Sequence, residues 1–138
     1  MQKYLKAYNL VAALREDYAN VTVVIISQQL ATATAEEQSL LAINEPQSWI
    51  REVYLQGDGK NLVRGRVVVP YTTYQAYQNV FDSLGNKFLG ESFLYKIEHT
   101  RSAFKYEKVG LRCQRQSIFY LNDNKHKLLV LEFFFNNH

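Results

Sequence analysis

The sequence predicts an α+β fold in which helices pack on a single antiparallel sheet of about six strands. Strand-like segments outnumber helix-like ones, and two of them are joined by a short hairpin turn. No helix-length polar segment separates the last three strand-like segments. Because 47% of the 138 residues are hydrophobic, we expect one domain, residues 1–138, around a sizeable core.

The N-terminal third predicts a helix, a strand and a second helix. Residues 2–18 carry apolar side chains at spacings of three and four, which is typical of an amphipathic helix. The β-branched run over 21–27 indicates a strand with both faces covered. Thr34 precedes two glutamates and is typical of a helix N-cap, so a short helix is expected over 34–41.

The middle of the chain predicts a hairpin followed by a helix. Residues 48–56 and 62–70 alternate between apolar and polar side chains, and the segment 57–60 between them contains an Asp-Gly pair typical of a hairpin turn. Beyond Pro70, Thr72 or Thr73 is expected to cap a helix that ends at Gly85, and a short turn follows over 89–94. Three antiparallel strands should complete the sheet, at residues 96–108, 111–121 and 127–135.

Composition and charge argue against several classes of function. The net charge of +3 is mild and the basic residues are scattered, whereas nucleic-acid binding usually needs a concentrated basic face. One cysteine and three scattered histidines predict neither a disulfide nor a metal site. No membrane span or secretion signal is apparent, so we expect a cytoplasmic protein. As a separate expectation, the protein is a monomer. The aromatic content of 14% suits strands and an apolar pocket.

Arg51 is the first charged residue in an apolar environment. The period of two places it on the same face of its strand as Trp49, Val53 and Leu55. A buried guanidinium needs a carboxylate, a set of carbonyls or an anionic ligand as its partner. Alternatively, Arg51 lies at the sheet margin, where its stem packs and its head reaches solvent.

Glu132 is the second such residue, because it interrupts a final strand that is apolar on both faces. It must either pair with a cation, with Arg51 as a candidate, or lie in a pocket with a raised pKa. Together the two residues predict an aromatic-lined cavity with one cationic and one acidic pole. Such a cavity suits a small anion with a hydroxyl or ether at its far end.

Three other residues have weaker functional signals. Arg64 and Arg66 share one face of their strand, which favours exposure to solvent. Cys113 is interpreted as a packing residue rather than a nucleophile, since no histidine is placed near it by spacing.

Several segments, in this order, resemble the chorismate lyase family between Ser48 and Phe135. They are Trp49-Ile50-Arg51-Glu52-Val53, Gly57-Asp58-Gly59, Gly65-Arg66-Val67-Val68-Val69-Pro70, Leu84-Gly85, Phe88-Leu89-Gly90, Arg115-Gln116-Ser117 and Leu131-Glu132-Phe133-Phe134. The resemblance implies conversion of chorismate to 4-hydroxybenzoate and pyruvate, the first committed step toward ubiquinone, without metal or cofactor. It also implies an antiparallel sheet flanked by helices.

The resemblance also implies roles for four residues. Arg51 matches the arginine that binds the ring carboxylate, and Glu132 the glutamate at the ether or hydroxyl end of the ring. Leu89 matches a position whose backbone N–H holds the carboxylate. Met1 falls where the family has a second such backbone donor. The family's N-terminal lead-in is missing here, which implies a truncated or divergent member.

A second resemblance keeps another function open. The effector-binding domains of GntR-type transcription regulators show a similar Arg-Glu strand, a Gly-Asp-Gly-like hairpin and a strand ending in proline. Their helix-turn-helix domain is absent from this sequence. Two alternatives to a lyase therefore remain: a module that binds an aromatic acid without catalysis, and a remnant of the enzyme that has lost its activity.

Overall fold

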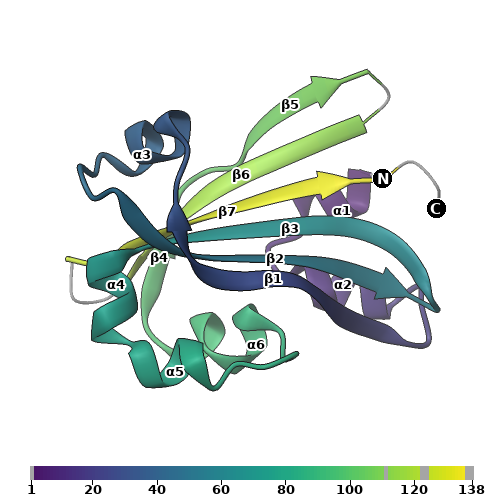
Figure 1. Ribbon diagram of the computed structural model, residues 1–138. Coiled ribbons are helices and arrows are strands. Elements are labelled where there is room, and N and C mark those ends of the chain that lie inside the picture. The colour runs from purple at the N-terminus through teal and green to yellow at the C-terminus, as the bar shows by residue number, and fades with distance from the viewer. Residues whose placement is uncertain (1, 111, 122–124, 136–138) are drawn as a thin grey trace.

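The computed structural model describes residues 2–110, 112–121 and 125–135, which form one antiparallel sheet with helices on both faces (Figure 1). The strand order is β1-β2-β3-β7-β6-β4, and β5 also pairs with β6. All pairs are antiparallel, which confirms the predicted fold class. The seven strands of the described residues are β1 (Val21–Thr32), β2 (Gln47–Gly57), β3 (Lys60–Pro70), β4 (His99–Arg101), β5 (Lys105–Val109), β6 (Arg112–Leu121) and β7 (Lys127–Phe134).

The helices divide between the two faces of the sheet (Figure 1). α3 (Ala35–Leu41) covers one face, where Leu41 packs with Ile50, Val68 and Leu129. The other helical elements cover the opposite face, on which Trp49 packs against Phe81, Leu89 and Phe93. They are α1 (Gln2–Lys6), α2 (Leu10–Arg15), α4 (Tyr71–Ala76), α5 (Gln78–Asp82), α6 (Leu89–Ser92) and the 3₁₀ helix η1 (Leu94–Lys96).

Two local predictions are confirmed in detail. Asp58 and Gly59 both have positive φ, at 49° and 84°, as a two-residue hairpin turn between β2 and β3 requires. Thr34 caps α3, where its hydroxyl accepts from the Glu37 N–H at 3.1 Å while the Glu37 carboxylate accepts from the Thr34 N–H at 2.9 Å. This reciprocal pair satisfies two of the backbone donors that a helix start leaves without partners.

The two longest predicted helices are each broken in the structure. Asn9 interrupts the segment 2–18, because its side chain accepts from the Ala12 N–H at 3.0 Å and caps α2 instead of continuing α1. After Pro70 the helix begins at Tyr71, so neither Thr72 nor Thr73 is its cap. The Thr73 hydroxyl instead donates to the Lys127 carbonyl at 3.0 Å and ties α4 to β7.

The prediction that residues 21–27 form a strand with both faces covered is wrong. β1 lies at the edge of the sheet and pairs with β2, and Val24, Ile25 and Ile26 are 42%, 36% and 42% exposed. A register shift between Ile25 and Ser27 breaks the alternation there. A run of β-branched residues indicates a strand, but it does not tell a central strand from an edge strand.

The predicted strand over 96–108 is two strands, β4 and β5, which both pair with β6. Ser102 lies between them, and its hydroxyl accepts from the Ile118 N–H at 2.8 Å. Its side chain thus replaces a backbone partner where the ladder is interrupted. Arg101, the last residue of β4, pairs with Phe119 on β6 and lies on the face of the sheet that carries Arg51.

Candidate functional site

A small cavity lies between the sheet and the elements α2, α6 and η1. Its volume is about 110 Å³, and valines, leucines and aromatic rings form most of its wall. Three charged residues reach it from the sheet: Arg51 from β2, Glu132 from β7 and Arg101 from β4. Cavities of this order accept a single benzene-sized ring. The sequence thus correctly predicted that Arg51 and Glu132 share an apolar pocket.

Arg51 is buried, at 3% exposure, so the prediction of a guanidinium that reaches solvent at the sheet margin is wrong. Its Nη2 donates to the carbonyls of Gly85 at 3.1 Å and Lys87 at 2.6 Å. Its Nε is buried, and no group among the described residues accepts from it. Burial lowers the pKa of Arg51 to about 10. The two carbonyls orient the guanidinium but do not neutralise it, so it remains a site for an anion.

Glu132 does not pair with Arg51, and that suggestion from the sequence is wrong. Its partner is Arg115, opposite it on β6, whose Nε donates to Oε1 at 2.7 Å and Nη2 to Oε2 at 3.4 Å. The Arg115 Nη1 also donates to the carbonyls of Leu5 at 2.9 Å and Ala7 at 2.7 Å. Arg115 thus fixes both the Glu132 carboxylate and the C-terminal end of α1.

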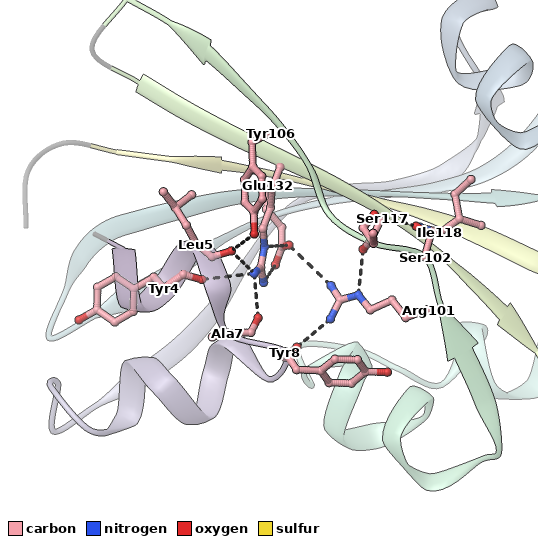
Figure 2. A network of polar contacts seen from close by, with 12 residues as sticks. Tyr4, Leu5, Ala7, Tyr8, Arg101, Ser102, Tyr106, Ser117, Ile118 and Glu132 are labelled. Carbon is pink, nitrogen blue, oxygen red and sulfur yellow. Dashed lines mark hydrogen bonds and ion pairs between the residues drawn. The ribbon is translucent and has the colours of Figure 1, made fainter.

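Arg101 gives this end of the cavity a second cation (Figure 2). Its Nη2 lies 3.8 Å from Glu132 Oε1, its Nε donates to the Ser117 hydroxyl at 2.9 Å, and its Nη1 donates to the Tyr8 carbonyl at 2.7 Å. Its guanidinium carbon lies 4.5 Å from the centre of the Phe119 ring. The cavity therefore has cations at both ends, rather than one cationic and one acidic pole.

The structure places one of the two expected backbone donors. Leu89 is the first residue of α6 and lines the cavity, so its N–H has no partner within that helix. Met1 lies outside the described residues, and its role stays a prediction. The neighbouring Gly90 has no room for a side chain, because a Cβ there would lie 2.6 Å from Cε2 of Tyr95, another residue of the cavity wall.

Sequence reasoning missed Arg101 and Arg115 as parts of the site. Arg115 carried a usable signal, since alternation places it on the same face of β6 as Ser117 and Phe119, which are buried. Arg101 carried none, because its three-residue strand is too short for a period to be seen.

Arg64 and Arg66 lie on the opposite face of the sheet. Arg66 is not free in solvent as predicted, because its Nε donates to Glu37 at 2.7 Å and its Nη1 to Glu52 at 2.5 Å. An open hollow of about 500 Å³ adjoins these residues and the half-buried thiol of Cys113. This hollow is larger than the cavity at Arg51, but two of its arginines, Arg64 and Arg66, already have carboxylate partners, and the third, Arg112, is exposed. The cavity, with its buried Arg51, is therefore the better candidate site.

The comparisons with known proteins agree with this geometry. A sequence model of the family described as "Chorismate lyase" matches residues 2–138. The chain belongs to the chorismate lyase family. A protein of Marinobacter nauticus named as a probable chorismate pyruvate-lyase is 39% identical over 106 residues, which are 70% of this chain and 55% of the relative. A chorismate pyruvate-lyase of Salmonella arizonae is 30% identical over 115 residues, 83% of this chain and 68% of the relative.

The match to the Marinobacter relative thus spans little more than half of that relative's length. Among solved structures, PhnF from Mycobacterium smegmatis matches with a TM-score of 0.69 at 12% identity, over 95% of this chain and 64% of PhnF. A ligand-binding domain from Bordetella bronchiseptica, assigned to the GntR family, matches with a TM-score of 0.62 at 11% identity, over 86% of each chain. At these identities the likeness shows a shared fold, which the resemblance to GntR-type effector domains had predicted.

Two features are absent from the residues that the structure describes. No helix in this part of the chain is long and apolar enough to cross a membrane. Within the same residues, no group of three or more histidine, cysteine, aspartate or glutamate side chains is placed to hold a metal ion.

Proposed function

We propose that this protein eliminates pyruvate from chorismate and forms 4-hydroxybenzoate. The observation that carries the proposal is Arg51, a buried guanidinium without a carboxylate partner among the described residues, at the wall of a cavity of about 110 Å³. Membership of the chorismate lyase family supports it. The cavity suits a ring acid whose carboxylate binds Arg51 and the N–H of Leu89.

The reaction needs little covalent chemistry from the protein. The ether C–O bond breaks and its electron pair leaves with enolpyruvate, while the neighbouring hydroxyl-bearing ring carbon loses its hydrogen as a proton. The enolpyruvate takes up one proton and becomes pyruvate, so protons balance overall. The ring becomes aromatic, so much of the driving force lies in the substrate. The task of the protein is to hold the ether in a reactive pose and to balance the charge that develops on the leaving oxygen.

Glu132 could act as a proton donor or as an orienting group, and the geometry favours orientation. Both carboxylate oxygens already accept from Arg115, and an ion-paired carboxylate is an acceptor rather than a donor. We therefore assign Glu132 to accept a hydrogen bond from the ring hydroxyl. In this position it holds the end of the ring opposite the carboxylate that Arg51 binds.

The rest of the assignment follows from the family. We propose that the reaction uses no cofactor, takes place in the cytoplasm as part of ubiquinone synthesis, and is carried out by a monomer. A ring acid held at both ends should leave slowly, so 4-hydroxybenzoate is expected to inhibit its own formation.

The decisive experiment adds chorismate to the purified protein and follows 4-hydroxybenzoate by its absorbance. Arg64→Gln, on the opposite face of the sheet, serves as the control for substitution of an arginine. Wild type and Arg64→Gln should form product while Arg51→Ala should not. No product from the folded wild-type protein would overturn the proposal.

The shared fold with a GntR-family ligand-binding domain supports a second candidate, a module that binds an aromatic acid without converting it. Calorimetric titration with 4-hydroxybenzoate distinguishes the two. Binding without turnover of chorismate would select the module.

A further inference from the structure

Arg101 is a cation at the cavity whose charge is not neutralised. Its side chain is 4% exposed and makes two hydrogen bonds, to a serine hydroxyl and a backbone carbonyl, both of which are neutral groups. Its Nη2 lies 3.8 Å from Glu132 Oε1, an ion pair beyond hydrogen-bond length with a carboxylate that Arg115 already binds. Burial lowers the pKa of Arg101, as expected for a guanidinium with too little compensation.

The charged residues around the cavity carry more positive than negative charge. Glu132 is matched by Arg115, which binds it through two nitrogens. Arg51 and Arg101 then remain as two buried cations without a carboxylate of their own. Glu91 also lines the cavity, but it is bound by the exposed Arg15 through two nitrogens. The described residues therefore leave about two positive charges for a ligand to neutralise, since buried charges need partners.

The two cations approach the cavity from different parts of the sheet. Arg51 lies on β2, and the register places Val67 on β3, Val130 on β7 and Ser117 on β6 successively beside it. Ser117 is the residue whose hydroxyl accepts from Arg101. The backbones of β2 and β6 are three strand spacings apart, or about 14 Å. The two guanidinium groups thus enter the cavity from strands that β3 and β7 separate, and a ring with two carboxylates can present one to each of them.

We propose that Arg101 is a second carboxylate-binding residue and that the cavity selects a dianion. The proposal rests on the proposed function for the identity of that dianion. Chorismate has one carboxylate on the ring and another on the enolpyruvyl group, whereas 4-hydroxybenzoate has only the first. Arg101 binds the enolpyruvyl carboxylate, next to the ether oxygen at which negative charge develops. When pyruvate leaves, that contact is lost from the product.

The test compares two unreactive ligands that differ in one charge. They are 3-(carboxymethoxy)-4-hydroxybenzoate and its neutral amide, 3-(carbamoylmethoxy)-4-hydroxybenzoate, titrated into the whole chain by calorimetry. Wild type should bind the acid about 10- to 100-fold more tightly than the amide, the usual worth of a charge-assisted hydrogen bond. Arg101→Gln should abolish this preference and leave binding of the amide unchanged within about twofold. Arg64→Gln should behave as wild type.

Three results would overturn the proposal. Wild type could bind the acid and the amide with equal affinity. This measurement uses no variant, so it does not depend on whether Arg101→Gln folds. Arg101→Gln could retain the preference for the acid. Alternatively, the variant could lose affinity for both ligands equally, which would show that Arg101 only supports the packing of Tyr8 and Phe119.

The outcome can be separated from failure of the proposed function. In one case wild type prefers the acid and Arg101→Gln removes that preference, but chorismate is not converted. The role of Arg101 in binding a dianion is then supported, and the assignment as a lyase is wrong. In the other case chorismate is converted, but wild type binds the acid and the amide with equal affinity. The assignment as a lyase is then supported, and the proposed role of Arg101 is wrong.

Discussion

Arg115 and Glu132 form a buried ion pair, with Nε of Arg115 2.7 Å from Oε1 of Glu132, and the same guanidinium binds backbone carbonyls at the C-terminal end of α1. The arginine side chain is 0% exposed and the glutamate 10%. This pair joins two functions, because it orients the carboxylate at the cavity and also attaches the N-terminal helices to the sheet. Changes at either residue should affect stability as well as ligand binding.

Arg51→Ala is expected to weaken binding of 4-hydroxybenzoate by about 2–4 kcal/mol, since it removes the cation from a buried ion pair. Arg51→Lys should restore only part of this, because an ammonium lacks the planar fork that matches a carboxylate. Titration calorimetry measures both variants, with Arg64→Gln as the control. An unchanged dissociation constant in Arg51→Ala would remove Arg51 from the site.

Glu132→Gln should lower the free energy of unfolding by about 3–5 kcal/mol, because it leaves the buried Arg115 without a countercharge. If Glu132 only orients the ring, single-turnover conversion of chorismate should fall about tenfold, whereas a proton donor would be worth about 10²–10⁴-fold. Urea unfolding and rapid-quench measurements under conditions where the variant is folded give the two numbers. A full single-turnover rate would exclude Glu132 from the mechanism.

Gly65→Ala should narrow the cavity with little loss of stability. Gly65 lies opposite Glu132 in the sheet, and a Cβ there would meet Cγ2 of Val53 at 3.4 Å, an ordinary contact. We expect weaker binding of 4-hydroxybenzoate, less inhibition by product, and a melting temperature close to that of wild type. Gly90→Ala is the contrasting variant, since its Cβ would collide with Tyr95 and should lower the melting temperature. Unchanged product binding in Gly65→Ala would place the ligand elsewhere.

The pH dependence of stability should report on Glu37, on the face of the sheet away from the cavity. Burial opposes ionisation of Glu37, but hydrogen bonds from Arg66 and Thr34 outweigh it and lower its pKa below the usual 4.5. A carboxyl with a lowered pKa in the folded state stabilises the fold above its unfolded pKa. This contribution is lost as the pH falls through the folded value.

We therefore expect the free energy of unfolding to decrease as the pH is lowered below about 4.5. Glu37→Gln should remove part of this decrease, while the same change at the exposed neighbour Glu36 should not. Urea unfolding between neutral pH and pH 3 provides the measurement. An identical slope in Glu37→Gln and wild type would contradict the assignment.

Patterns within short stretches of the sequence were enough to predict several features of the fold and of the candidate site. Alternation along β2 placed Arg51 among apolar residues, an apolar β7 singled out Glu132, and the Asp-Gly pair and Thr34 predicted a turn and a cap that the structure confirms. Each of these features is determined by residues close to it in the sequence, because strand alternation and capping hydrogen bonds involve only residues a few positions apart. The resemblance to the chorismate lyase family added Leu89, which does line the cavity.

Partners across the sheet depended on the tertiary structure. Strand order sets β6 beside β7 and so gives Glu132 the guanidinium of Arg115, while Arg101 comes from a short strand that ends just before Ser102. The edge position of β1 was equally hidden in its sequence. The physical reason is that a strand's sequence determines which side chains share a face, whereas the neighbouring strand is selected by the packing of the whole sheet. Ion pairs between strands therefore appear only once that packing is known.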